Sequence, residues 1–260
     1  MFRKIFCTLL LMILFCCGCA KKERVNDDFS TILERDQLIV GVREDTRPFG
    51  FKNNDGTLAG YDVELAKIFA KYLLGNENKV RFVPVTAANR MMKLGAKEVD
   101  ILVATMSITP QRQQIIDFSV PYYIAGQAIL VSKNSDINSL KGFNGRKLII
   151  VYGSTSERNI KTNIPDVKII GYKTYTEAYK ALKEGKADGM LADDTVLMGF
   201  SLTDNSVKIL PQRYSQEPYA VAFRKGEESL KLQNKVNTIL DNLQYSGELF
   251  RMQEKWGIKN

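Results

Sequence analysis

Small hydroxyl side chains and one arginine gather in residues 100–119, which makes this segment the best candidate for chemistry. It opens with an apolar run that has the length of a short buried strand, and Thr105, Ser107 and Thr109 follow. A proline then fits the first turn of a helix, and helical spacing aims Arg112 back toward the end of the strand. Hydroxyls, helix-start amides and an arginine together suit a carboxylate. A strand–loop–helix connection with a surface arginine is the ordinary alternative.

Composition excludes several kinds of chemistry. The chain of 260 residues has no histidine, and its four cysteines, at positions 7, 16, 17 and 19, all lie near the start. The rest of the chain therefore has no disulfide, zinc site or thiol nucleophile, and it lacks the commonest general base. We expect no cofactor, no metal and no catalysis. The formal net charge is +8, and the lysines are scattered among acidic residues along the chain. We therefore expect a solvated surface that mildly favours anionic ligands, and no nucleic-acid partner.

The first eighteen residues have the composition of an export signal. Two basic residues precede an apolar stretch, residues 5–15, that is too short for a permanent membrane-spanning helix. Gly18 and Cys19 follow, and this ending resembles a lipobox, in which the cysteine is lipidated and becomes the mature N-terminus. Cys16 stands where that motif usually has leucine, and an ordinary signal peptide cut elsewhere is the alternative. We expect a lipid anchor at Cys19, on the extracytoplasmic face of the cell membrane or in the periplasm.

Strand-like and helix-like patterns alternate through the rest of the chain, which predicts an α/β fold. The alternation stops near residue 124 and then restarts, so we expect two lobes, each built on a parallel or mixed sheet. Two extended runs, residues 124–131 and 217–223, would cross between the lobes as a two-strand hinge. The predicted division is a signal peptide (1–18), a tether (19–35), a first lobe (36–124 plus 222–260) and a second lobe with the hinge strands (125–221).

The pattern also predicts the individual elements. The strands are expected at residues 38–42, 80–85, 99–103, 147–152, 168–172, 187–192 and 207–210, and the helices at 29–34, 61–74, 89–97, 156–163, 176–184, 226–244 and 247–256.

Five motifs then occur in the order and spacing of a known family. They are GYDVELA (60–66), FVPVTAANR (82–90), ATMSITPQR (104–112), DFSVPYY (117–123) and GST (153–155). From about residue 37 to residue 257 the chain resembles the polar amino-acid-binding proteins of ABC importers, bacterial extracellular solute-binding protein family 3. The resemblance implies a two-lobed periplasmic binding protein fold of type II, an amino acid held between the lobes, and permease subunits in the membrane as partners. We expect a monomer.

The resemblance assigns the recognition of the ligand's α-carboxylate to both lobes. Arg112 would clamp the carboxylate, because its fork of donors matches a planar carboxylate, and Ser107 would assist it. The Gly-Ser-Thr turn of the second lobe would supply further donors from Ser154 and Thr155.

The ligand's ammonium group is assigned to the end of a strand in the second lobe. Asp193 would accept the ammonium, with Asp194 as the alternative if the register is shifted by one residue, and Thr105 would back this pocket. A pair of helix N-cap residues is the ordinary interpretation of the two aspartates.

Departures from the family pattern inform specificity. Thr46 stands where histidine- and glutamine-binding members carry an aromatic residue, and Ala87 and Ala88 replace the usual ring of the second wall. Arg43 and Arg90 stand nearby, in a pattern that resembles the glutamate/aspartate-binding branch, where such residues meet a side-chain carboxylate. We therefore expect glutamate or aspartate as the ligand. Solvated surface positions are the ordinary alternative for both arginines.

Other functions remain open alternatives. The ligand would otherwise be glutamine or another polar amino acid. An enzyme on the same fold, such as a cyclohexadienyl dehydratase, would need a carboxylic acid in the cleft, for which Glu157 or Asp194 are candidates. A sensor ectodomain or a cell-wall lytic enzyme would need an additional domain or a second membrane span, and we expect neither.

Overall fold

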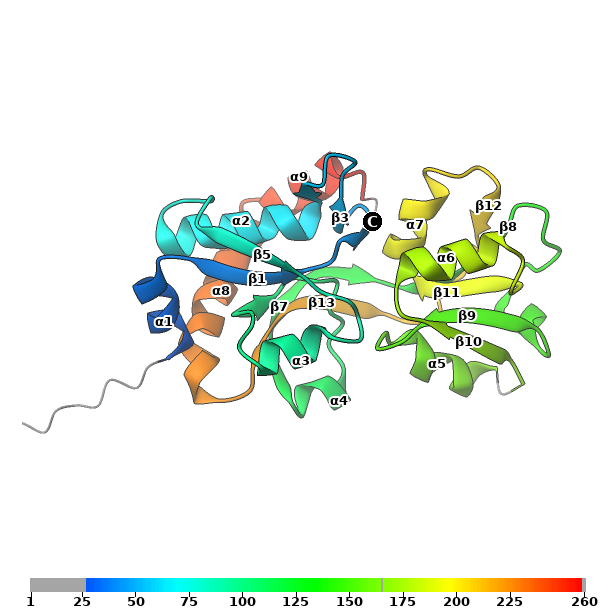
Figure 1. Cartoon of the computed structure of the whole chain (residues 1–260), viewed down its shortest axis with the longest axis horizontal. Coiled ribbons are helices and arrows are strands. Elements are labelled where there is room, and N and C mark those ends of the chain that lie inside the picture. Colours follow the sequence, from blue (N-terminus) through cyan, green and yellow to red (C-terminus); the bar gives the residue numbers. More distant parts are fainter. Residues whose placement is uncertain (1–26, 165, 259–260) are drawn as a thin grey trace, which may run out of the picture.

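A computed structural model describes residues 27–164 and 166–258 of the chain. The predicted signal peptide and the predicted lipidation site at Cys19 lie outside the described residues. Two α/β lobes lie side by side along the long axis of the molecule (Figure 1). Within the described part of the chain, no helix is both long enough and apolar enough to cross a membrane.

The first lobe is built on a mixed five-stranded sheet. One inner strand of this sheet has the sequence LIVGV and is buried along its whole length, as expected for a strand that is covered on both faces. This strand pairs in parallel with both of its neighbours, whereas the last strand of the lobe pairs antiparallel. The strand order is β5 (Val80–Pro84), β1 (Leu38–Val42), β6 (Ile101–Leu102), β13 (Glu217–Arg224) and β7 (Ile116–Ala125).

Helices cover both faces of this sheet (Figure 1). One face packs against α1 (Asp28–Arg35), α2 (Tyr61–Leu74), α8 (Glu227–Tyr245) and α9 (Glu248–Lys255). The other face packs against α3 (Arg90–Gly95), and α4 (Pro110–Gln113) lies next to β7. A small antiparallel sheet of β2 (Asp45–Thr46), β3 (Gly50–Lys52) and β4 (Leu58–Ala59) stands at the edge that faces the second lobe.

The second lobe repeats the same layering around a second five-stranded sheet. The strand order is β10 (Lys168–Tyr172), β9 (Lys147–Val151), β11 (Gly189–Asp193), β8 (Gln127–Ser132) and β12 (Val207–Ile209). On one face lie α6 (Tyr175–Lys183) and α7 (Asp194–Ser201); on the other lie α5 (Ser156–Asn163) and the 3₁₀-helix η1 (Leu140–Phe143).

The chain crosses between the lobes at two adjacent places, as the sequence predicted. β7 continues into β8 through Gly126, and β13 begins at Glu217, opposite Ala125. The crossings lie close together, because a Cβ on Gly126 would approach the carbonyl oxygen of Ser215 to 3.0 Å. All of β13 pairs within the first sheet, so residues 217–221 belong to that sheet, although the predicted division gave them to the second lobe.

The N-terminal helix is part of the first lobe. Asp27 caps it by accepting a hydrogen bond from the amide of Ser30 at 2.7 Å, and Phe29 and Ile32 enter the core. Residues 28–35, which the predicted division counted as tether, therefore pack as a structural element.

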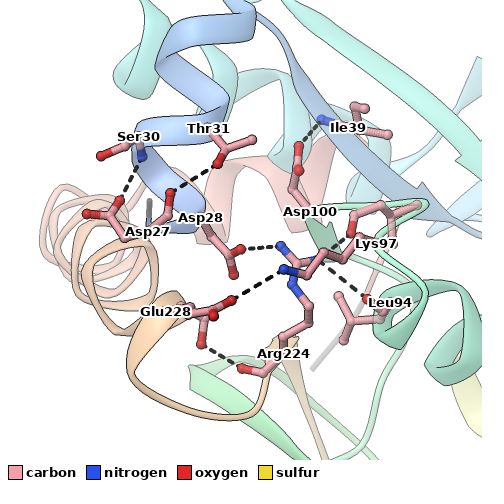
Figure 2. Close-up of polar contacts among 12 residues, drawn as sticks. Asp27, Asp28, Ser30, Thr31, Ile39, Leu94, Lys97, Asp100, Arg224 and Glu228 are labelled. Atoms are coloured by element: carbon pink, nitrogen blue, oxygen red, sulfur yellow. Dashed lines mark hydrogen bonds and ion pairs between the residues drawn. The ribbon is translucent and has the colours of Figure 1, made fainter. Parts of the chain in front are cut away.

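An arginine at the end of β13 holds this helix in place (Figure 2). Arg224 pairs with Asp28, and its Nη1 donates to the carbonyl oxygens of Val99 at 2.8 Å and Leu94 at 3.4 Å. Beside it, Asp100 accepts from the amide of Ile39 at 2.7 Å. These contacts join segments from both ends of the chain at the far side of the first lobe.

Candidate functional site

Arg112 is positioned by a short capped helix and reaches across the junction of the lobes. The hydroxyl of Thr109 caps α4 by accepting from the amide of Arg112 at 3.2 Å. The guanidinium donates to the carbonyl oxygen of Ser107 at 2.8 Å and to that of Gly153, in the second lobe, at 3.0 Å. Arg112 is therefore buried at the junction and contacts both lobes.

Asp193 is the last residue of β11 and is buried against the first lobe, whereas Asp194 forms an ion pair within the second lobe. The hydroxyl of Tyr219, on β13, donates to Asp193 at 2.6 Å. Burial raises the pKa of Asp193 to about 7, and the negative charge of Glu217 adds to this shift. Asp193 makes no capping hydrogen bond to α7, while Asp194 accepts from Arg213 at 2.7 Å. Of the two aspartates, Asp193 is thus the one whose charge calls for a cation at the junction.

Thr105 lies in a left-handed backbone conformation, with φ of 47°. Its amide donates at 2.9 Å to Asp62, which also accepts from the hydroxyl of Tyr122 at 2.9 Å. Asp62 lies in the first turn of α2, and burial raises its pKa to about 7. Sequence reasoning missed this supporting role of Asp62, although the residue stands inside the GYDVELA motif.

Arg90 carries a buried positive charge and forms no ion pair within 4.0 Å in the described part of the chain. It is 3% exposed, and its Nη1 donates to the carbonyl oxygens of Ala104 at 2.6 Å and Thr105 at 3.2 Å. Its Nε has no hydrogen-bond partner in the part of the chain that the structure describes. Burial lowers the pKa of Arg90, and the neighbouring charges of Arg112 and Arg43 lower it further. An anionic group at this point would relieve the electrostatic cost.

Arg43 is also buried at the junction, but it has a partner in the protein. Its Nε and Nη2 donate to one oxygen of Asp45 at 3.0 and 2.6 Å. The guanidinium also lies 5.0 Å from the centre of the Tyr175 ring, at the start of α6. Sequence reasoning missed both Asp45 and Tyr175. The capping box formed by Thr174 and Glu177 could have located the start of α6 and therefore Tyr175.

The two hydroxyls of the Gly-Ser-Thr turn donate to the protein, in contrast to the role that the sequence suggested for them. The Thr155 hydroxyl donates to Glu217 at 2.9 Å and accepts from the side chain of Gln127 at 2.8 Å. The Ser154 hydroxyl donates to the carbonyl oxygen of Val151 at 2.6 Å. Thr155, Gln127 and Glu217 thus form a buried network where the chain crosses between the lobes.

The positions that departed from the family pattern lie at this same junction. Thr46 and Ala87 are buried, and the ring beside Arg43 comes from Tyr175 in the second lobe. A hollow of about 470 Å³ opens beside them, lined by residues of both lobes that include Glu44, Asp45, Lys52, Thr86, Asn89, Thr174 and Thr176. The structure thus brings Arg43, Arg90, Arg112 and Asp193 to the junction of the lobes, and Thr105 and Ser107 lie beside Arg90 and Arg112 through their carbonyl oxygens.

The carboxylic acids suggested for an enzyme are one surface residue and one residue that is paired within the second lobe. Glu157 is exposed on α5, and Asp194 is engaged by Arg213. Among residues 27–164 and 166–258, no group of three or more histidine, cysteine, aspartate or glutamate residues could hold a metal ion.

Two α/β lobes joined by two crossings, with buried charges of both signs at their junction, define a two-lobed solute-binding protein. Comparison with known proteins agrees: the chain belongs to the bacterial extracellular solute-binding proteins, family 3, which match residues 38–259. It is 34% identical to the ABC transporter glutamine-binding protein GlnH of Bacillus subtilis, over 98% of this chain and 97% of GlnH. It is 39% identical to a glutamine-binding protein of Geobacillus stearothermophilus, over 75% of each chain.

Solved structures agree with the fold. An ancestral arginine-binding protein bound to glutamine matches with a TM-score of 0.80 and 37% identity, over 86% of this chain and 99% of the other. The predicted two-lobed fold is confirmed. The relatives named here are solute-binding proteins, and they do not support the glutamate/aspartate branch that the sequence pattern favoured.

Proposed function

We propose that the chain is an extracytoplasmic receptor that binds an amino acid, glutamine before others, and delivers it to an ABC permease. One observation carries the proposal: Arg112 and Asp193 are both buried at the junction, and the positive charge of Arg112 acts on the pKa of Asp193. An α-amino acid bears a carboxylate and an ammonium group on one carbon, so it can neutralise both side chains at once. Arg90, which is buried and has an Nε without a hydrogen-bond partner in the described chain, would strengthen the site for the carboxylate.

The preference for an amide side chain follows from the state of Arg43. The expectation of glutamate or aspartate relied on both Arg43 and Arg90, but Arg43 is already balanced by Asp45. A guanidinium paired with a carboxylate offers a donor and an acceptor, which match the carbonyl and NH2 groups of glutamine. A second ligand carboxylate would meet the negative charge of Asp45. The names of the two relatives and the glutamine-bound ancestral structure support the same ligand.

A binding screen tests this function. The purified protein would be heated with each of the twenty common amino acids, because a ligand bound only by the native state raises the melting temperature. Isothermal titration would then rank glutamine, glutamate, aspartate, arginine and cystine. We expect glutamine to bind about tenfold or more tightly than glutamate. If no amino acid raises the melting temperature the receptor function is wrong, and if glutamate outranks glutamine the ligand is wrong.

The lipid anchor at Cys19 is part of the proposal. It is supported by the sequence alone, through the apolar leader and the Gly18-Cys19 pair. Mass analysis of the mature N-terminus in cells should find acylated Cys19. The Cys19→Ala variant should be unlipidated, while Cys17→Ala, a change of a neighbouring leader cysteine, should keep the lipid. An unmodified N-terminus at another residue would contradict the anchor and leave the binding function untouched.

A further inference from the structure

We infer that Asp45 is a specificity-determining residue: by pairing with Arg43 inside the protein, it makes the site select against amino acids with an anionic side chain. The inference rests on the proposed function, because it concerns how the side chain of the bound amino acid is chosen.

The pairing is built into one short segment. Arg43 directly follows β1, and Asp45 opens β2, so a tight bend brings the two side chains together. Two of the three guanidinium nitrogens of Arg43, Nε and Nη2, donate to the same oxygen of Asp45, at 3.0 and 2.6 Å. The Arg43 side chain is 1% exposed and that of Asp45 is 13% exposed. A buried guanidinium requires an anion, and Asp45 supplies it without any contribution from a ligand.

Arg43 belongs to the electrostatic environment of the proposed site. Its guanidinium lies 5.0 Å from the ring of Tyr175, a residue of the opposite lobe. Its charge helps to lower the pKa of Arg90, as does that of Arg112. The phenol of Tyr175 in turn has its pKa raised first by burial and then by the charge of Asp193. Arg43 therefore acts on the same groups as the residues proposed to hold the carboxylate and the ammonium.

The negative charge of Asp45 is fixed in position from both lobes. Its second oxygen accepts from the amide of Tyr175 at 3.1 Å, in the first turn of α6, where the helix dipole favours an anion. The hydroxyl of Thr46 donates to the first oxygen at 3.2 Å. With these donors on both oxygens, Asp45 is held in place when the lobes are together. An anionic ligand side chain near Arg43 would then meet a fixed like charge.

Neutralising Asp45 should therefore change which ligand binds best. The Asp45→Asn variant keeps an oxygen for the amide of Tyr175 but removes the negative charge from Arg43. By isothermal titration, glutamate should bind about tenfold or more tightly than it binds the wild type, while the affinity for glutamine should fall, because the carboxylate that accepts from its NH2 group is lost. Adding Arg43→Gln to Asp45→Asn should abolish the gain for glutamate.

A neighbouring acid supplies the matched control. Glu44 lines the same hollow and pairs with Lys52 at 3.1 Å, but no hydrogen bond or ion pair joins it to Arg43 in the described chain. Glu44→Gln removes the same charge one residue away and should leave the ratio of the two affinities within about twofold of the wild type. A similar gain for glutamate in Glu44→Gln would overturn the inference, because general electrostatics would then explain it.

Two further outcomes decide the question. If Asp45→Asn weakens both ligands equally, Asp45 only helps the lobes to close and the inference is wrong. If Asp45→Asn does not fold, Asp45→Ser provides the same loss of charge with a smaller side chain. The same rise in the ratio of glutamate affinity to glutamine affinity is then expected of Asp45→Ser. The ranking of ligands by the wild type tests the proposed function, whereas the change in the glutamate-to-glutamine ratio tests Asp45, so the two failures are distinguishable.

Discussion

Gly153 of the second lobe lies directly against the backbone of Ala87 in the first. A Cβ on Gly153 would stand 2.6 Å from the carbonyl oxygen of Ala87 and 2.8 Å from the Cα of Ala88, which is closer than real Cβ atoms come. The contact joins the GST turn to the FVPVTAANR motif, and Arg112 also donates to the carbonyl oxygen of Gly153. The structure is thus a closed arrangement, in which the lobes meet at a point where only glycine fits.

The first prediction follows from this contact. Gly153→Ala should keep the lobes from closing fully and should weaken glutamine binding about tenfold or more. Gly185→Ala is the matched control, because Gly185 also has a positive φ, of 71° against 77°, but nothing lies within 4 Å of its added Cβ. Small-angle scattering should show that ligand shrinks the wild type and Gly185→Ala more than Gly153→Ala. Equal affinities in the two alanine variants would show that closure does not depend on this contact.

Arg112 should contribute to the binding of every amino acid. Arg112→Lys keeps the charge but loses the planar fork that donates to Ser107 and Gly153. We expect all amino acids that bind the wild type to bind this variant about ten- to a hundredfold more weakly, with their order of preference unchanged. Titration with the ranked panel checks this. A variant that loses one ligand and keeps another would place Arg112 at the side-chain end of the site instead.

Asp193 and Asp194 form a natural pair of variants, since the same change is made at adjacent positions. Asp193→Asn should weaken amino-acid binding about tenfold or more and raise the melting temperature without ligand, because it removes a costly buried charge. Asp194→Asn should leave ligand affinity nearly intact and cost about 1 kcal/mol of stability or less, since its partially exposed pair with Arg213 is lost. Titration and thermal unfolding of both variants would check this. The reverse assignment of effects would move the ammonium site to Asp194.

Asp62 should make the stability of the protein depend on pH. Its pKa rises from an ordinary value of 3.8 to about 7 in the fold, first because of burial. The folded state therefore binds more protons than the unfolded state between about pH 4 and 7, and stability falls as the pH rises through this window. Asp62→Asn keeps an oxygen for the amide of Thr105 and an NH2 group for Tyr122, but it cannot ionise.

The measurement for this prediction is thermal unfolding without ligand at several pH values. The difference in melting temperature between Asp62→Asn and the wild type should shift in favour of Asp62→Asn from pH 4 to pH 8. The reason is that ionisation of the buried Asp62 carboxyl destabilises only the wild type. Parallel curves for the two proteins across that range would contradict the raised pKa.

Much of the fold was predictable because local signals agreed with it. The strand at 38–42 and the helix at 61–74 have the predicted bounds, and the helix ends at Gly75, whose left-handed conformation suits glycine. The strand predicted at 99–103 is shorter and covers only 101–102. Its apolar run continues to Ala104, and Thr105 then adopts a left-handed conformation that no sequence propensity indicates.

The candidate site was predictable only where a motif carried it. Arg112 came from the ATMSITPQR motif, whereas Asp193 was assigned to a strand end through the family resemblance, and both contact the opposite lobe. The partner of Arg43 was not foreseen, because Asp45 reaches it through a bend between strands and not through a periodic pattern. Contacts between distant segments, such as that of Thr155 with Glu217, depend on how the chain crosses between the lobes and have no local signal.

The position of β13 has a consequence for the order in which the protein assembles during synthesis. All five strands of the second sheet lie between residues 127 and 209, so this lobe can be completed while the ribosome is still adding the rest. The first sheet must wait, because its strand between β6 and β7 is residues 217–224, and Arg224 then secures Asp28 from 196 residues earlier. Synthesis of the first lobe thus begins before that of the second lobe, but its sheet is completed later. The long-range pairing of β13 with β6 and β7 should therefore be the rate-limiting step of folding.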